Sequence, residues 1–202
     1  TIIEQGDIWK YFLGTQEPPS KWRDSIFTDF SWTSGISGFG YGDGDDQTKI
    51  ENVPSKYLRK IFNIKDLSNI TQVMFNIDFD DAYIAYLNGI EISRKNIGNP
   101  YEEIPFNRYS DTFVEARLYQ NQMLDAIFLE EPHSTLVNGS NVLAIQVHNS
   151  SLSSSDLTAI PFLTLGYKST ESENDVAEEI SPLLPTPHSN FKISNGQESI
   201  YL

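Results

Sequence analysis

Two groups of aspartates are the residues of this sequence with the clearest capacity for chemistry. The first lies in the run Gly38-Phe-Gly-Tyr-Gly-Asp-Gly-Asp-Asp46 and supplies Asp43 and Asp45. Carboxylate oxygens on a flexible loop are ligands that Ca²⁺ prefers, so both residues are candidate ligands of a structural calcium ion. The spacing is not that of an EF-hand, because Thr48 stands where that motif requires glycine. A solvated glycine turn with scattered charges is the alternative explanation.

The second group follows an apolar run that begins at Val73. It contains Asp78, Asp80 and Asp81, and the adjacent pair Asp80-Asp81 stands at the expected end of a strand. Two carboxylates at such a corner could bind one cation. Aspartates there could equally start a turn by accepting hydrogen bonds from nearby backbone amides. A joint site formed by both groups is a further hypothesis.

The segment from His148 to Asp156 holds a histidine, several serines and an aspartate. A hydrolase would need a serine hydroxyl, an imidazole and a carboxylate to converge beside an oxyanion hole, and nearness in sequence does not establish that. The run Gly-x-Ser-x-Gly that marks many such enzymes is absent from the sequence. Serine and aspartate side chains that bond their own backbone explain the segment more simply. We therefore predict no enzymatic activity for this chain.

Aromatic residues are concentrated near the start of the chain. The first 41 residues contain Trp9, Trp22, Trp32, Phe39 and Tyr41, interleaved with Gly, Ser and Pro. Flat rings on loops can stack on sugar rings while carboxylates and amides bond the hydroxyl groups. The alternative is that these rings fill the core at the open end of a sandwich.

Composition excludes several other classes of function. The 202 residues carry 28 Asp and Glu against 14 Lys and Arg, a formal net charge of −14. That balance argues against nucleic acid and anionic membranes, which bind basic surfaces. The absence of Cys excludes disulfides, thiolate catalysis and Cys-ligated metals. With 39% hydrophobic and 12% aromatic residues the chain can still build a core.

The elements that must position these residues read as β-strands. From Val73 to Phe79 apolar and polar residues alternate, which is the period of a half-buried strand. Residues 83–87 and 90–94 flank Asn88-Gly89, a strong signal for a type I′ hairpin turn. Only 121–129 could form a helix. Further strands are expected at 7–13, 57–64, 112–118, 142–148 and 161–167. Many short strands separated by turn residues predict an all-β sandwich of mainly antiparallel strands.

The composition changes after residue 168. Residues 169–190 are acidic and proline-rich, which is typical of a linker. Residues 191–202 contain two short apolar segments around Asn195-Gly196 and predict a hairpin, interpreted as the truncated start of a following β domain. The alternative is an extra strand pair docked on the main domain, residues 1–168.

Three motifs in this order carry a family resemblance over about residues 7–168. They are the run from Trp32 through Gly40-Tyr-Gly-Asp-Gly44 to Thr48, then Phe79-Asp-Asp81 with Tyr86-Leu-Asn-Gly-Ile-Glu91 and Arg94, then Gly139-Ser-Asn-Val-Leu-Ala-Ile-Gln-Val-His-Asn149 with Asp156. The chain thereby resembles a non-catalytic jelly-roll module of the galactose-binding-like fold. Such modules occur in secreted bacterial multidomain proteins beside spore-coat-H-type kinase, lamin-tail or hydrolase domains. Residues 191–202 are similar to the first strands of a lamin-tail-like domain.

The resemblance implies a secreted or cell-surface bacterial protein whose sandwich binds carbohydrate beside other domains. With the loop aromatics it gives the candidate ligand-binding residues Trp32, Tyr41, Tyr86, Asn88, Arg94 and His148. The Asp-Asp and Asn-Gly pattern is also similar to the sugar-binding domain of the anthrax protective-antigen type, where such a pair binds calcium. The candidate metal ligands are thus Asp43, Asp45, Asp80 and Asp81. The family usually has Gly where this chain has Ala82. The alternative function is a structural spacer or interaction sandwich without a small-molecule ligand.

Overall fold

Alternation of apolar and polar side chains builds the strands around the core. In the computed structural model, which describes residues 1–129 and 131–168, Val73, Phe75 and Ile77 of strand β6 are buried. The residues between them, Met74 and Asn76, are only half-buried. This period of two is what a strand with one face in the core requires. The predicted strand at 73–79 is confirmed and extends over Ile70–Asp80.

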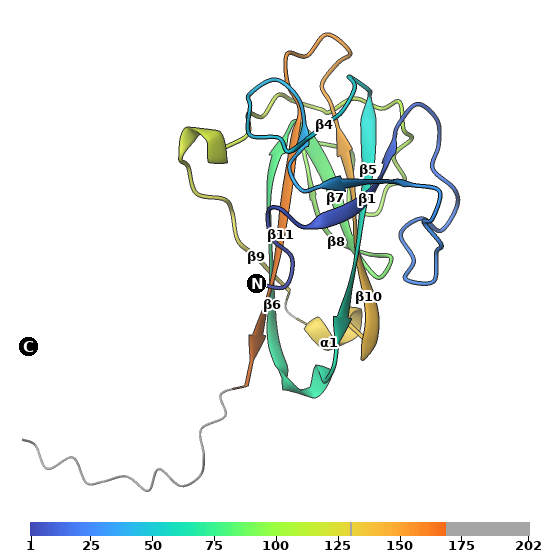
Figure 1. Ribbon diagram of the computed structural model, residues 1–202, viewed down its shortest axis with the longest axis vertical. Coiled ribbons are helices and arrows are strands. Elements are labelled where there is room, and N and C mark those ends of the chain that lie inside the picture. The colour runs from blue at the N-terminus through green and yellow to red at the C-terminus, as the bar shows by residue number, and fades with distance from the viewer. Residues whose placement is uncertain (130, 169–202) are drawn as a thin grey trace, which may run out of the picture. The chain divides into compact units, whose positions relative to one another are not determined.

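The elements occur mainly as strands, with short helical turns between them (Figure 1). A turn of 3-10 helix at Leu67–Asn69 precedes β6, another lies at Leu118–Gln120, and the single short α-helix α1 spans Pro132–Thr135 in the described residues. The strands are β1 Ile8–Leu13, β2 Thr33–Ile36, β3 Phe39–Gly40, β4 Thr48–Lys49, β5 Ser55–Ile64, β6 Ile70–Asp80, β7 Ala82–Leu87, β8 Ile90–Lys95, β9 Ile127–Leu129, β10 Gly139–His148 and β11 Thr158–Tyr167.

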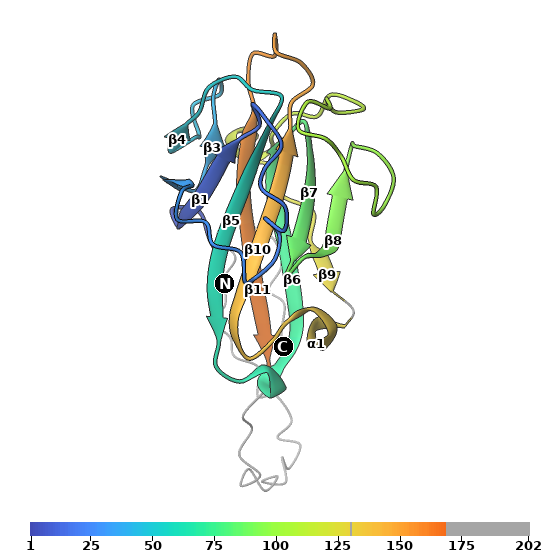
Figure 2. The same ribbon diagram turned by 90° about the vertical axis from the view of Figure 1, so that its right-hand side faces the viewer.

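Two antiparallel sheets pack face to face; Figure 1 shows the two layers edge-on, and in Figure 2 the larger sheet lies in front of the smaller one. The larger has six strands in the order β2-β1-β5-β10-β7-β8, and the smaller has three in the order β11-β6-β9. Strands β3 and β4 form a short parallel pair beside them. The all-β sandwich predicted from the sequence is confirmed. No described helix is long and apolar enough to cross a membrane.

The six-stranded sheet is covered on both faces. Its inner face packs against the smaller sheet through a cluster that includes Leu58, Phe75, Leu143 and Ile145. Its outer face carries a second cluster, in which Tyr57 of β5 and Tyr86 of β7 pack with the loop residues Trp22, Trp32 and Ile104. Burial of large apolar side chains on both faces is a major source of stability for the central strands, at about 25 cal/mol per Å² of apolar surface removed from water.

Arg59 of β5 fastens the loop that covers the outer face. Its side chain is buried, and Nε lies 2.9 Å from Oδ2 of Asp29. The guanidinium also donates to the carbonyl groups of Trp22, Asp24 and Phe27. One cation therefore satisfies several polar groups of a loop that would otherwise cover the sheet with unpaired carbonyls.

The predicted hairpin is confirmed, whereas two other expectations are wrong. Asn88 and Gly89 both have positive φ, 51° and 87°, as a type I′ turn requires. Residues 112–118 do not form the expected strand, because their backbone amides donate to aspartate side chains instead of to a neighbouring strand. The segment 121–129 ends in strand β9, and no helix forms there in its described residues. The linker and hairpin expected at 169–190 and 191–202 lie outside the described residues.

Candidate metal centre at one end of the sandwich

The glycine-rich loop after β3 is held against the start of β11. Tyr41 and Leu157 exchange backbone hydrogen bonds of 3.0 Å in each direction. At Gly40 a Cβ atom would lie 1.7 Å from the carbonyl oxygen of Leu157 and 2.6 Å from Oδ2 of Asp46, so only glycine fits. This close approach turns the loop back on itself and brings its aspartates together. In Figure 1 the loop and the β10–β11 connection lie at the end of the sandwich opposite α1.

Asp43, Asp45 and Asp46 form the first group of carboxylates. One oxygen from each lies within 4.8 Å of the others. Oδ2 of Asp43 accepts a hydrogen bond of 3.2 Å from Thr158. Oδ1 of Asp43 and both oxygens of Asp45 and of Asp46 are buried, and none accepts a hydrogen bond from a described residue. Buried charges are normally paired or bound to metal, so this set of oxygens suits a hard cation.

The surroundings make these carboxyl groups hard to ionise. Desolvation, followed by the direct interaction with the carboxyl group of Asp43, raises the pKa of Asp45 to about 7. Desolvation also raises the pKa of Asp46 to about 6, against the opposing attraction of Lys56. Like charges crowded in a poorly solvated loop raise one another's pKa values. A divalent cation would remove that penalty by supplying the missing positive charge.

Asp80, Glu115 and Asp156 form the second group, also with oxygens within 4.8 Å of one another. Asp80 ends β6, Glu115 lies in the 112–118 segment, and Asp156 precedes β11. Asp80 is 2% exposed, and its Oδ1 accepts no hydrogen bond within the described part of the chain. Desolvation, then the charges of Asp81, Asp156 and Glu115, raise the pKa of Asp80 to about 8.

Asp78 and Asp81 have a different role from Asp80. The oxygens of Asp78 accept from the amides of Arg117 at 2.7 Å and Leu118 at 2.8 Å. Those of Asp81 accept from the amides of Val114 at 3.1 Å and Ser150 at 2.7 Å. Both side chains thus bond loop backbone, which was the alternative considered for this acidic group. Asp81 lies outside both carboxylate groups.

The two groups adjoin each other around Thr158 and Lys56. Thr158 lies opposite Asp80 in the β6–β11 ladder, so the two side chains share a face, and its hydroxyl bonds Asp43. The fully buried Lys56 donates to the carbonyl oxygen of Phe39 at 2.5 Å. Desolvation lowers the pKa of Lys56 to about 7, opposed by Asp46, Asp80, Asp43 and Asp45 in that order. The predicted ligands Asp43, Asp45 and Asp80 are therefore brought to one end of the sandwich.

The candidate ligand-binding residues do not converge on one place. Trp32 is 4% exposed and packs on Phe12, with ring centroids 5.4 Å apart. Tyr41 accepts from Asn149 at 2.9 Å and donates to the carbonyl oxygen of Ser154. The amide group of Asn88 donates to Asn141 at 2.8 Å.

His148 and Arg94 are likewise engaged within the protein. His148 is fully buried, its Nδ1 lies 2.6 Å from the carbonyl oxygen of Arg108, and its Nε2 has no hydrogen-bond partner among the residues described. Desolvation lowers the pKa of His148 to about 4. Arg94 makes two bonds with Glu91, of 3.0 and 2.8 Å.

Tyr86 lines a shallow surface pocket of about 180 Å³. The pocket is formed by Arg23, Tyr86, Gly89, Glu91, Tyr101, Glu102 and Glu103. Arg23 lies over the ring of Tyr86 at 4.7 Å and pairs with Glu103 at 2.8 Å. The ring of Tyr101 stands out from the surface with 79% of the residue exposed. Of the candidate ligand-binding residues, Tyr86 lines this pocket, and Arg94 bonds Glu91, which also lines it.

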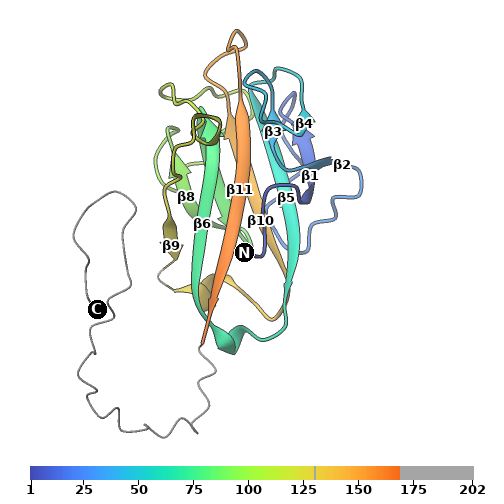
Figure 3. The same cartoon turned by 60° about the vertical axis from the view of Figure 1, so that its left-hand side comes forward.

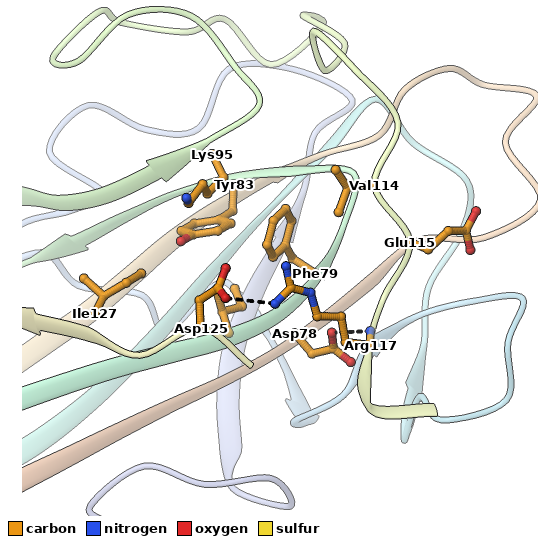
Figure 4. A pocket seen from close by; sticks show the side chains of 10 residues that line it. Asp78, Phe79, Tyr83, Lys95, Val114, Glu115, Arg117, Asp125 and Ile127 are labelled. Atoms are coloured by element: carbon orange, nitrogen blue, oxygen red, sulfur yellow. Dashed lines mark hydrogen bonds and ion pairs between the residues drawn. The ribbon is translucent and has the colours of Figure 1, made fainter. Parts of the chain in front are cut away.

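A cavity between β6, β7, β9 and the 112–118 segment is too small for a ligand. Its volume of about 10 Å³ is at the lower limit for a single water molecule. Figure 4 shows Tyr83 and Phe79 on one side of it and the Arg117–Asp125 pair, 3.0 Å long, on another. Glu115 points away from these residues in the same view.

Several residues of the two carboxylate groups escaped prediction. Asp46 belongs to the glycine loop that the sequence marked, but it was not selected as a ligand. Glu115 and Asp156 are far from Asp80 in sequence and meet it only because of the chain's topology. Asp156 ends the segment from His148 that was interpreted as a Ser- and Asp-rich loop, and no local sequence pattern connects it to Asp80. Residues Arg23 and Tyr101 of the surface pocket carried no recognisable signal.

No protein-family model matches this sequence, and no curated protein is similar to it. Solved structures with a partial likeness include a calcium-binding mutant of a Bacteroides uniformis β-glucuronidase (TM-score 0.43, 16% identity, 77% of this chain and 17% of that one). A Bacteroides vulgatus β-glycosidase has a TM-score of 0.45 and 10% sequence identity, over 80% of this chain and 20% of that one. A Bifidobacterium dentium β-glucuronidase complexed with coumarin-3-O-glucuronide has a TM-score of 0.45 and 13% sequence identity, over 72% of this chain and 20% of that one.

This chain therefore spans about a fifth of the length of those glycoside hydrolases. The identities and TM-scores are too low to carry an argument about function.

Proposed function

We propose that this chain is a non-catalytic, carbohydrate-directed binding module that is accessory to other domains of a larger secreted or cell-surface protein. The surface pocket around Tyr86 and Tyr101 is the observation that carries the carbohydrate assignment. It combines an exposed aromatic ring with one guanidinium and three carboxylates. Rings of this kind offer an apolar face to a sugar, and the charged groups can bond its hydroxyls.

The size of the pocket agrees with a small polar ligand. Its volume of about 180 Å³ is below the roughly 300–1,000 Å³ of pockets for drug-sized molecules. Glu91 and Glu102 are held in place by Arg94 and Asn99, at 2.8 Å in each case. Fixed polar groups beside an exposed ring are suited to one sugar unit of a longer glycan.

A calcium ion at Asp43, Asp45 and Asp46 is the second part of the proposal. Their buried oxygens lack hydrogen-bond donors within the described residues, and the ligand oxygens lie close enough to surround one ion. Ca²⁺ is favoured over Mg²⁺ because the loop is glycine-rich and supplies carboxylates and carbonyls without strict octahedral geometry. The ion would stabilise the loop at this end of the sandwich.

Affinity electrophoresis through gels containing a panel of polysaccharides tests the carbohydrate assignment. We expect at least one polysaccharide to retard the protein. Tyr101→Ala should abolish that retardation, and Glu103→Gln should reduce it. Tyr167→Ala is the matched control, because Tyr167 is also exposed and does not line this pocket. Unchanged mobility on every polysaccharide would overturn the assignment.

A structural spacer is the second candidate, and the burial of the tryptophans favours it. Trp9, Trp22 and Trp32 are 1%, 7% and 4% exposed, so their rings serve packing. A spacer needs a rigid sandwich and no ligand. Failure of the polysaccharide test with an intact fold would support this function.

A further inference from the structure

We propose that Asp80, Glu115 and Asp156 form a second divalent-cation site, adjoining the Asp43–Asp45–Asp46 loop but built from different elements. An ion at this site would link three segments that belong to different parts of the chain. They are the corner after β6, the 112–118 segment and the connection between β10 and β11. The site lies at the same end of the sandwich as the Asp43–Asp45–Asp46 loop and does not depend on carbohydrate binding.

The buried carboxylate of Asp80 is the observation that points to a ligand. The residue is 2% exposed, and its Oδ1 receives no hydrogen bond from the described residues. Its neighbours Asp78 and Asp81 differ, because two backbone amides satisfy each of them. A buried polar atom without a partner costs stability, so the lone oxygen of Asp80 needs an explanation that its neighbours do not.

The distances suit one ion held by all three side chains. Their ligand oxygens lie within 4.8 Å of one another. Oxygens bind Ca²⁺ at about 2.3–2.6 Å, so two ligands on opposite sides of the ion are about 4.6–5.2 Å apart. The spacing of the three carboxylates is therefore compatible with one shared ion.

The other partners of Glu115 and Asp156 leave oxygens free for an ion. Oε2 of Glu115 accepts from the hydroxyl of Tyr119 at 3.2 Å, and Oδ1 of Asp156 accepts from Ser155 at 3.0 Å. Glu115 is exposed and Asp156 is half-buried. The site is consequently closed on the Asp80 side and open to water on the Glu115 side. Water molecules could complete the six to eight oxygen ligands that Ca²⁺ takes.

Isothermal titration of the full 202-residue chain with CaCl₂, after removal of metal with a chelator, tests the site. We expect two ions per chain for the unaltered protein and one for Asp45→Asn/Asp46→Asn. Addition of Glu115→Gln/Asp156→Asn to that variant should weaken the remaining binding at least about tenfold. These two residues are chosen because neither is buried. Glu4→Gln/Glu51→Gln removes the same charge from exposed positions and is the matched control.

Three outcomes decide the proposal. Loss of the second ion with Glu115→Gln/Asp156→Asn and its retention with the control would establish the site. Equal binding by both variants would overturn it, as would the absence of any ion in a folded Asp45→Asn/Asp46→Asn protein. If Asp45→Asn/Asp46→Asn does not fold, Glu115→Gln/Asp156→Asn alone in the unaltered chain must reduce the stoichiometry from two to one, and an unchanged stoichiometry rejects the proposal.

Discussion

Protons and metal ions compete for the same oxygens at the acidic end of the sandwich. The pKa values of Asp45, Asp46 and Asp80 are raised to about 7, 6 and 8. Each group therefore binds a proton more tightly in the folded protein than in the unfolded chain. Without metal, the stability that these protons give is complete below the ordinary Asp pKa and is lost as pH rises through 6 to 8.

Calcium should therefore stabilise the protein more at pH 8 than at pH 5. At pH 5 the three carboxyl groups are largely protonated and must release protons to bind an ion, whereas at pH 8 an ion removes their repulsion. Melting temperatures with CaCl₂ and with chelator, measured at pH 5, 6, 7 and 8, check this. The comparison at each pH cancels contributions of groups that do not sense the ion. An equal calcium effect at pH 5 and pH 8 would contradict the prediction.

His148 is expected to limit stability in acid. Its pKa is lowered from 6.5 to about 4 because the buried ring is desolvated. The unfolded chain then binds more protons between these values, so stability falls as pH drops from about 6.5 to 4. At 1.36 kcal/mol per pKa unit, this amounts to about 3 kcal/mol at pH 4.

His148→Asn should reduce that loss, because an amide can still donate to the carbonyl oxygen of Arg108 and cannot take up a proton. Urea unfolding at pH 6.5 and pH 4 measures the difference. His133→Asn is the control, since His133 is an exposed residue of α1 whose ring, like that of His148, lies within hydrogen-bond distance of a backbone carbonyl oxygen, that of Ile70 at 2.8 Å. The same acid sensitivity in both variants would argue against His148 as its source.

The element that depends most on a single small residue is β3. A side chain at Gly40 would meet both the carbonyl oxygen of Leu157 and the carboxylate of Asp46. Gly40→Ala should push β3 away from β11, lower the melting temperature and weaken calcium binding. In Gly166→Ala the nearest atom would lie 3.2 Å from the new Cβ, so that variant is the control for a milder change. Calcium titration of both variants measures the effect. An unaltered calcium affinity in Gly40→Ala would disprove the role of this contact.

The loop over the outer face depends on Arg59. Arg59→Gln would leave the Asp29 carboxylate and several buried carbonyls without their donor, and breaking a buried pair in this way costs about 3–5 kcal/mol. Urea unfolding measures the loss, and fluorescence of Trp22 and Trp32 reports release of the loop. Lys60→Gln, which removes a partly exposed pair with Asp7 at 3.1 Å, should cost at most about 1 kcal/mol. Equal losses in the two variants would refute the assignment.

Local patterns predicted the elements well and the contacts between them poorly. Alternation identified β6, and Asn88-Gly89 identified the β7–β8 turn, because both signals reside in neighbouring residues. The 112–118 segment has the apolar content of a strand, yet Asp78 and Asp81 capture its amides from another part of the chain. Glu115 and Asp156 could not be predicted as partners of Asp80 for the same reason, because the chain's topology, and not a local pattern, brings them together.

At the scale of the whole molecule, both hydrophobic clusters and all described strands lie within residues 1–168. Figure 3 shows β11 lying along β6, where it completes the smaller sheet. This strand buries Ile160, Leu163 and Leu165. Its ladder with β6 continues over the full length of both strands. A truncation that removes β11 should therefore destroy the core.

A chain that ends after Lys168 should still fold cooperatively, because both hydrophobic clusters and all described strands lie within it, whereas one that ends after Leu157 should not fold. Loss of β11 exposes one edge of β6 and removes a row of backbone hydrogen bonds, which no other described strand can replace. For a domain of this size 1 kcal/mol corresponds to about 2–4 °C, so thermal unfolding followed by circular dichroism resolves a small contribution. Absence of a cooperative thermal transition in the chain ending at Lys168, or its presence in the chain ending at Leu157, would contradict the prediction.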